Sequence, residues 1–327
     1  MKIIVIVGPT ASGKSGLAVK LARKFSAKGG PASGWNGAEV ISADSRQVYK
    51  GMDIGSGKVS RDKKILNFRA RSIHNTSFTI VKEVLFFYKG IRHHLIDVVS
   101  PKRTFTVARY QKLGRLAIKD ILKRKKIPIV CGGTGLYIRA LIDGLVIPEV
   151  KPNFKLRKEL EKKSTEELFE ILKKKDPRRA KEIDSKNRRR LIRALEIIEA
   201  MSVVPKLKFE PLRAEVLMIG IKKDKGTLKK LIRERLLKRL QLGMIKEVQK
   251  LHDSGISYKK LESFGLEYRY GAQFLQKKIS KEEMIKELLK AIYDYVKRQM
   301  TWFKKDKRIH WVENPREAEK LTNTFIK

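Results

Sequence analysis

The chain reads Gly8-Pro9-Thr10-Ala11-Ser12-Gly13-Lys14-Ser15 directly after an apolar, β-branched run at residues 2–7 and before an amphipathic stretch at residues 15–25. This is the pattern G-x-x-x-x-G-K-[ST] in the strand–loop–helix setting that its mechanism requires. The glycines let the loop curl so that backbone N–H groups converge on phosphate oxygens, and the helix N-terminus adds partial positive charge. Lys14 would reach a terminal phosphate, and the Ser15 hydroxyl could ligate Mg²⁺. The loop therefore predicts a diphosphate or triphosphate ligand, but it does not choose among ATPases, kinases and transferases that release diphosphate.

The remainder of the chain predicts an α/β fold. Further short β-branched runs occupy residues 39–42, 94–99, 127–131, 215–221 and 309–312. Helical patterns separate several of them, and this alternation predicts right-handed crossovers within a mostly parallel sheet. Long helical patterns at residues 227–253 and 281–304 should pack back on that sheet. We expect a P-loop parallel-sheet core flanked by helices.

One region breaks the alternation of strands and helices. Residues 146–213 carry helical periodicity and almost no strand signal. They predict an all-helical insertion domain, residues 146–213, within an α/β core made of residues 1–145 and 214–327. Residues 28–37 and 60–92 resemble extra surface loops, and the second of these, with its basic and aromatic residues, could alternatively be an RNA-binding arm.

Charge and cysteine content narrow the partners and the compartment. The 327 residues include 76 Lys plus Arg against 35 Asp plus Glu, a formal net charge of +41, which favours an anionic partner. Charge alone does not separate nucleic acid from a generally basic surface. Cys131 is the single cysteine, so no internal disulfide or cysteine-based zinc site can form, and we expect a cytoplasmic protein. No apolar stretch approaches the roughly 18 residues of a membrane span, so we expect no membrane partner.

The residues that indicate the type of reaction follow the predicted strand at residues 39–42. There the chain reads Ala43-Asp44-Ser45-Arg46-Gln47. A carboxylate at the C-terminal end of a parallel strand beside the P-loop strand faces the ligand crevice. Asp44 could therefore be a general base or a metal ligand.

Together with the P-loop, this run resembles the tRNA dimethylallyltransferases, also called tRNA isopentenyltransferases, of bacterial type. Further matching segments occur in the family's order at residues 93–97, 132–137, 189–196, 264–269 and 298–302. The resemblance spans residues 8–302. It implies transfer of a dimethylallyl group from dimethylallyl diphosphate to N6 of adenosine 37, beside the tRNA anticodon, by a monomer.

The resemblance also implies that the insertion domain, residues 146–213, binds tRNA and that the core, residues 1–145 and 214–327, is catalytic, and it implies roles for particular residues. It places Asp44, Lys14, Thr134 and Arg235 in the catalytic set. The N6 lone pair is delocalised into the adenine ring, so attack on carbon needs a base, and Asp44 is the matching carboxylate. Lys14 and Arg235 would stabilise the charge of the departing diphosphate, although Arg235 could instead lie on a solvated helix face.

A base must leave its helix or loop to reach such a pocket, and an anticodon-loop base can be flipped out at modest cost. The tRNA-binding residues implied by the resemblance are Asp44, Ser45, Arg46, Gln47, Thr134, Arg157, Arg189, Arg190, Leu191, Ile192 and Arg193. An ordinary basic helix face is the alternative for the arginines of residues 188–193. We expect Gln299 and Trp302 to belong to a helix packed on the core, His93 to be structural and Cys131 to be a buried thiol.

Two other functions compete with prenyl transfer. A P-loop kinase of a small metabolite would share the Gly8–Ser15 loop, but no arginine-rich lid of the kinase type follows the third predicted strand. A catalytically silent RNA-binding protein could keep the fold. The combination of Lys14, Ser15, Asp44 and Thr134 favours an enzyme over this second alternative.

Overall fold

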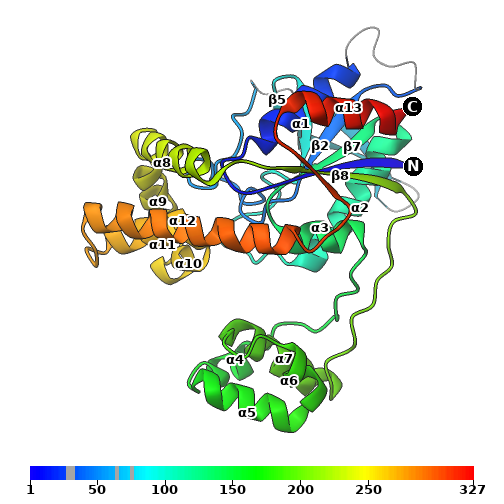
Figure 1. Ribbon diagram of the computed structural model, residues 1–327. Helices are drawn as coiled ribbons and strands as arrows, with labels where there is room; N and C mark the ends of the chain where they lie inside the picture. The colour runs from blue at the N-terminus through cyan, green and yellow to red at the C-terminus, as the bar shows by residue number, and fades with distance from the viewer. Residues whose placement is uncertain (27–33, 63–65, 74–76) are drawn as a thin grey trace. The chain divides into compact units, whose positions relative to one another are not determined.

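The computed structural model describes residues 1–26, 34–62, 66–73 and 77–327 (Figure 1). The chain forms two compact units, one of Met1–Asp143 with Leu212–Lys327 and the other of Gly144–Pro211. Among the described residues, no helix is long and apolar enough to cross a membrane.

The first unit is built on a seven-stranded sheet of order β5-β6-β2-β7-β1-β8-β9. Its strands are β1 (Lys2–Val7), β2 (Ala38–Ser42), β5 (Phe86–Tyr88), β6 (Ile91–His94), β7 (Ile127–Cys131), β8 (Glu215–Ile221) and β9 (Ile309–Val312). The P-loop strand β1 lies between β7 and β8 and pairs with both in parallel, with Ile4 opposite Ile129 and Leu217. Only the β5–β6 pair of this sheet is antiparallel. The predicted α/β fold is confirmed.

Helices cover both faces of this sheet because β1 is apolar on both sides. Ile4 and Ile6 pack in one cluster with helices α1 (Lys14–Ser26) and α13 (Pro315–Ile326). Ile3, Val5 and Val7 face the opposite cluster, which includes residues of α2 (Val107–Lys123) and α3 (Gly135–Ile142). The continuous burial of β1 holds the P-loop at the carboxyl end of a central strand.

A helical layer extends from the sheet in the first unit (Figure 1). Its helices are α8 (Lys225–Gln241), α9 (Met244–Asp253), α10 (Tyr258–Ser263), α11 (Leu266–Leu275) and α12 (Lys281–Phe303). The single helix predicted at residues 227–253 is wrong, because Gly243 adopts φ +94° and separates α8 from α9. A capping box between Ser280 and Glu283 begins the long helix α12, which packs along α11 and reaches α3.

The second unit is helical. It contains α4 (Phe154–Leu160), α5 (Thr165–Lys175), α6 (Pro177–Glu182) and α7 (Arg188–Met201). Leu168, Leu172 and Leu191 are fully buried in its own core. The predicted insertion domain spans residues 146–213, and this helical unit spans Gly144–Pro211.

Two local predictions are corrected by the backbone. The strand predicted at residues 94–99 ends at His94, because Leu95 and Asp97 adopt φ values of +61° and +56° that no strand accommodates. The loop predicted at residues 60–92 instead contains an antiparallel pair, β3 (Leu66–Ile73) and β4 (Ser77–Val84), followed by β5 and β6. The sequence LNFRARSI of β3 alternates apolar and polar residues with the period of a strand. Of the predicted loop at residues 28–37, residues 28–33 lie outside the described part of the chain.

Candidate active site

The P-loop curls tightly between β1 and α1. Gly8 and Gly13 adopt φ values of +143° and +90°, a region that disfavours side chains. A Cβ at Gly8 would also lie only 3.0 Å from the carbonyl oxygen of Ile221 on β8. Lys14 Nζ donates a hydrogen bond to the Pro9 carbonyl across 2.5 Å, so the lysine head lies within its own loop.

A pocket of about 460 Å³ opens beside this loop. Its walls come from the P-loop, residues 44–60, the turn after β7, and helices α8 and α12. The predicted site residues that line it are Thr10, Ala11, Gly13, Lys14, Ser15, Asp44, Gln47 and Arg235. The fold therefore brings into one cavity three of the four predicted catalytic residues, which lie up to 221 positions apart in the sequence.

Asp44 is held in one orientation by the turn that follows it. Its Oδ1 accepts hydrogen bonds from the backbone N–H groups of Arg46, at 2.8 Å, and Gln47, at 3.3 Å. Within the described residues, Oδ2 of Asp44 accepts no hydrogen bond. One carboxylate oxygen is thus occupied by the backbone and the other is available to a ligand in the pocket.

Thr134 supports this turn from the loop after β7. Its hydroxyl accepts a hydrogen bond from the backbone N–H of Ser45 across 3.1 Å, and its own N–H donates to the Ala43 carbonyl across 3.1 Å. Thr134 does not line the pocket. Through these two hydrogen bonds Thr134 contacts the residues on either side of Asp44.

Arg235 points into the site from α8. Its Nη1 donates to Thr10 Oγ1 across 3.1 Å, and its Nη2 lies only 2.0 Å from where a Cβ of Gly57 would be. Burial, with the charge of Arg239, lowers the pKa of Arg235 to about 10. Glu267 accepts a 2.5 Å hydrogen bond from Arg239. The alternative of a solvated helix face for Arg235 is wrong.

The other ionisable groups of the pocket respond to burial. Burial lowers the pKa of Lys14 to about 8, and the nearby Arg235 contributes in the same direction. Burial raises the pKa of Cys131 to about 12, in keeping with the predicted buried thiol.

His93 lies outside this pocket. Its ring is buried and Nδ1 contacts the Ile91 carbonyl at 2.9 Å, which is a structural position. Within the described residues, no three His, Cys, Asp or Glu side chains gather as a metal cluster.

Gln299 belongs to the site more closely than its helix pattern predicts. Its Oε1 accepts from the backbone N–H of Thr10 across 2.9 Å, and its Nε2 donates to the Gly133 carbonyl across 2.9 Å. The side chain is 5% exposed and joins the P-loop to the turn after β7. A polar residue on the buried face of an amphipathic helix is the sequence signal for such a role.

The predicted tRNA-binding residues of the insertion separate into three groups. Arg189 and Arg190 are exposed at the start of α7. Leu191 and Ile192 are buried in the core of the second unit, so tRNA contact through their side chains is wrong. Arg157 and Arg193 both bind the buried carboxylate of Glu196.

A P-loop with a neighbouring carboxylate and a half-buried arginine in one pocket defines the class of phosphate-binding P-loop enzymes. Two family models match the chain, "IPP transferase" over residues 47–306 and "Isopentenyl transferase" over residues 1–80. The chain therefore belongs to the tRNA dimethylallyltransferase family, as the resemblance predicts.

The similarity to known proteins extends over nearly the whole chain. The tRNA dimethylallyltransferase 1 of Geotalea daltonii is 39% identical over 315 residues, covering 95% of this chain and 90% of the relative. The tRNA dimethylallyltransferase 2 of Treponema denticola is 38% identical, covering 94% and 95%. The crystal structure of the tRNA isopentenylpyrophosphate transferase of Bacillus halodurans has a TM-score of 0.66 at 30% identity, covering 99% of this chain and 95% of that one.

Proposed function

We propose that this enzyme transfers a dimethylallyl group from dimethylallyl diphosphate to N6 of adenosine 37 in the anticodon loop of tRNA. The names of its relatives support transfer to tRNA. The observation that carries the proposal is a pocket in which a phosphate loop, two half-buried cations and the carboxylate of Asp44 meet. This arrangement provides a place for a diphosphate, and next to it a base for the acceptor.

The diphosphate of the donor binds the P-loop. The loop amides and the N-terminus of α1 attract its oxygens, and Lys14 turns from the Pro9 carbonyl toward a phosphate. Arg235, held by Thr10 Oγ1, faces the same cavity. Both cations act where negative charge develops as the allylic carbon–oxygen bond breaks, and their partial burial strengthens the attraction.

The Ser15 hydroxyl would hold Mg²⁺ beside the P-loop. The donor set fits, because Mg²⁺ commonly takes only one or two protein oxygens and completes its shell with phosphates and water. Ser15 lines the pocket beside Lys14. The bound ion supplies further positive charge against the leaving diphosphate.

Asp44 acts as the general base. As N6 of the adenine attacks the allylic carbon, Asp44 Oδ2 accepts the N6 proton, a new carbon–nitrogen bond forms, and the diphosphate leaves with the electron pair of the carbon–oxygen bond. The amides of Arg46 and Gln47 fix Oδ1 and so aim Oδ2. Thr134, which holds Ser45, is a positioning residue in this scheme.

The tRNA contacts two regions of the chain. The flipped adenosine enters beside Asp44, Ser45, Arg46 and Gln47, while the exposed Arg189 and Arg190 of the insertion bind phosphates. Arg157 and Arg193 support the insertion through Glu196. We also propose that the enzyme acts as a monomer and that it works on its tRNA substrate in the cytoplasm.

The proposal is tested by incubating the purified chain with radiolabelled dimethylallyl diphosphate and bulk tRNA. We expect label in the tRNA, and dimethylallyladenosine on mass spectrometry of its nucleosides, only when both substrates are present. A parallel reaction with γ-labelled ATP tests the kinase alternative. Phosphoryl transfer from ATP without tRNA, or tRNA binding with no transfer at all, would contradict the proposal.

A further inference from the structure

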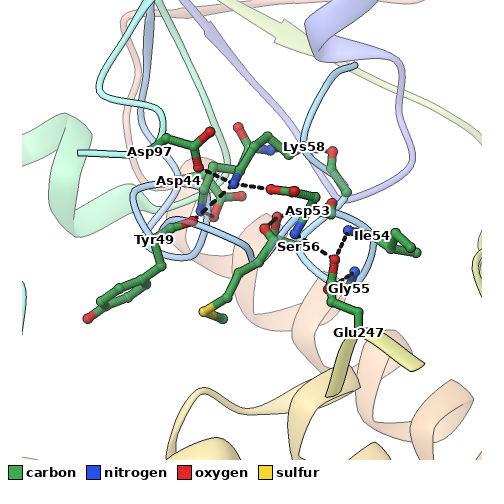
Figure 2. Close-up of polar contacts among 12 residues, drawn as sticks. Asp44, Tyr49, Asp53, Ile54, Gly55, Ser56, Lys58, Asp97 and Glu247 are labelled. Carbon is green, nitrogen blue, oxygen red and sulfur yellow. Dashed lines mark hydrogen bonds and ion pairs between the residues drawn. The ribbon is translucent and has the colours of Figure 1, made fainter. Parts of the chain in front are cut away.

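One carboxylate of the helical layer clasps the turn at residues 53–58. Glu247 on α9 accepts backbone hydrogen bonds through Oε2 from Asp53, at 2.8 Å, and Ile54, at 2.7 Å, and through Oε1 from Gly55, at 3.0 Å (Figure 2). The hydroxyl of Tyr268 donates to Glu247 Oε1 across 2.9 Å and accepts from the Ser56 N–H across 3.1 Å. Four successive amides of the turn are therefore held by one carboxylate and the phenol bound to it.

The same turn is held from its other side by Lys58. The ammonium of Lys58 binds Asp53 Oδ1 at 2.5 Å, Asp97 Oδ1 at 2.5 Å and the Tyr49 carbonyl at 3.0 Å (Figure 2). Its side chain is only 2% exposed. Asp97 follows the end of β6, so Lys58 connects the turn to the sheet while Glu247 connects it to the helices.

The position of this turn determines the shape of the donor pocket. Residues 56–60 line that pocket together with residues of the P-loop. Gly57 fits against the guanidinium groups of Arg235 and Arg239, since a Cβ there would lie 2.0 Å and 1.8 Å from their Nη2 atoms. A shift of the turn by the width of one methyl group would therefore move Arg235, or leave it without the surface against which it rests.

We propose that Glu247 is a positioning residue for the donor pocket. Its carboxylate holds the 53–58 turn so that Gly57 keeps the Arg235 guanidinium beside Thr10 and the P-loop. The inference rests on the proposed function, because it assigns Arg235 to the diphosphate. A carboxylate is required because its two oxygens accept all three amide hydrogen bonds, whereas a carboxamide presents an NH₂ group to at least one of the donors.

The test compares Glu247→Gln with Glu234→Gln, an exposed carboxylate on α8 that undergoes the same charge change. For each variant we would measure KM for dimethylallyl diphosphate, KM for tRNA, the Kd of inorganic diphosphate by calorimetry, and Tm. Kinetics are compared at a temperature where all variants are folded. For Glu247→Gln we expect about tenfold weaker binding of donor and diphosphate, the size of one lost charged hydrogen bond, with KM for tRNA changed less than about twofold. Glu234→Gln should leave these constants unchanged.

Introducing Arg235→Lys into the unaltered enzyme and into Glu247→Gln shows whether Glu247 acts through Arg235. If it does, the double variant binds diphosphate about as weakly as Arg235→Lys alone, because the lost interaction is shared. Additive losses, an equal rise in both KM values, or diphosphate binding unchanged by Glu247→Gln would overturn the inference. If the proposed function is wrong, the unaltered enzyme transfers no label from dimethylallyl diphosphate to tRNA. The diphosphate Kd values of the variants still show whether Glu247 positions the pocket.

Discussion

The side-chain oxygen of Gln299 accepts a hydrogen bond from the backbone N–H of Thr10, 289 positions earlier in the chain, across 2.9 Å. The amide nitrogen of the same side chain binds the Gly133 carbonyl. Gln299→Leu has a similar shape but leaves that part-buried N–H and carbonyl without this partner, at a cost of up to about 1–3 kcal/mol for each group. We expect a lower Tm and weaker diphosphate binding, measured by thermal unfolding and calorimetry. Wild-type diphosphate affinity in a folded Gln299→Leu variant would contradict this role.

The pKa of Lys14 makes donor binding depend on pH. Because burial lowers this pKa to about 8, the free enzyme loses the ammonium charge as pH rises through 8. A bound diphosphate stabilises the charged form and raises the pKa, so affinity should be full below pH 8 and fall by up to about tenfold per pH unit above it. Calorimetry in buffers of different ionisation enthalpy should detect proton uptake on binding near pH 8.5. Lys14→Met removes the contribution of the lysine and retains the titration of the ligand, so identical pH profiles for the two proteins would refute the prediction.

Arg189 and Arg190 should account for the salt-dependent part of tRNA binding by the insertion. Each phosphate contact contributes about 0.7 to 0.9 to the slope of log K against log salt, so Arg189→Gln with Arg190→Gln should flatten that slope by about 1.5. The matched control is Arg316→Gln with Lys320→Gln, which removes two exposed charges from α13. Parallel lines for the double variant and the parent would return both arginines to an ordinary basic helix face.

Glu39 should stabilise the fold without affecting the reaction. It is 2% exposed, and hydrogen bonds from Arg124, His94 and Lys126 outweigh burial and hold its pKa well below the ordinary value. A depressed folded-state pKa means that this stabilisation is present above about pH 4.5 and is lost as pH falls below it. Glu39→Gln should lower the free energy of unfolding at pH 7 by on the order of 3 kcal/mol, with diphosphate affinity unchanged. Denaturant unfolding at pH 7 and pH 4 checks the size and sign, since the difference between variant and parent should shrink at pH 4.

The parts of the site that the sequence predicts are those encoded locally. The P-loop needs its two glycines, its lysine and the flanking strand and helix within a short segment, and Asp44 directly follows the next strand in the chain. The contacts that hold these parts together are long-range. Gln299 and Glu247 each meet backbone amides about 190 or more positions away, and nothing in their own helices specifies those partners.

Helix patterns alone do not distinguish the arginines of the insertion from one another. Arg189, Arg190 and Arg193 lie within one helical turn and a half of each other on α7. Only the structure shows that Glu196 is buried and takes Arg193 together with Arg157, whereas Arg189 and Arg190 face solvent. The buried carboxylate of Glu196 therefore distinguishes the paired Arg157 and Arg193 from the exposed Arg189 and Arg190.

In the proposed reaction Asp44 takes the N6 proton while the P-loop holds the diphosphate. The single-turnover rate of dimethylallyl transfer in Asp44→Asn, measured with saturating tRNA alongside diphosphate affinity, separates these two roles. We expect a rate about 10² to 10⁴ lower than that of the unaltered enzyme, the usual contribution of a general base, with the diphosphate Kd changed less than about twofold. An unaltered rate would show that Asp44 is not the base, and lost diphosphate binding with normal turnover of the bound complex would make Asp44 a metal ligand instead.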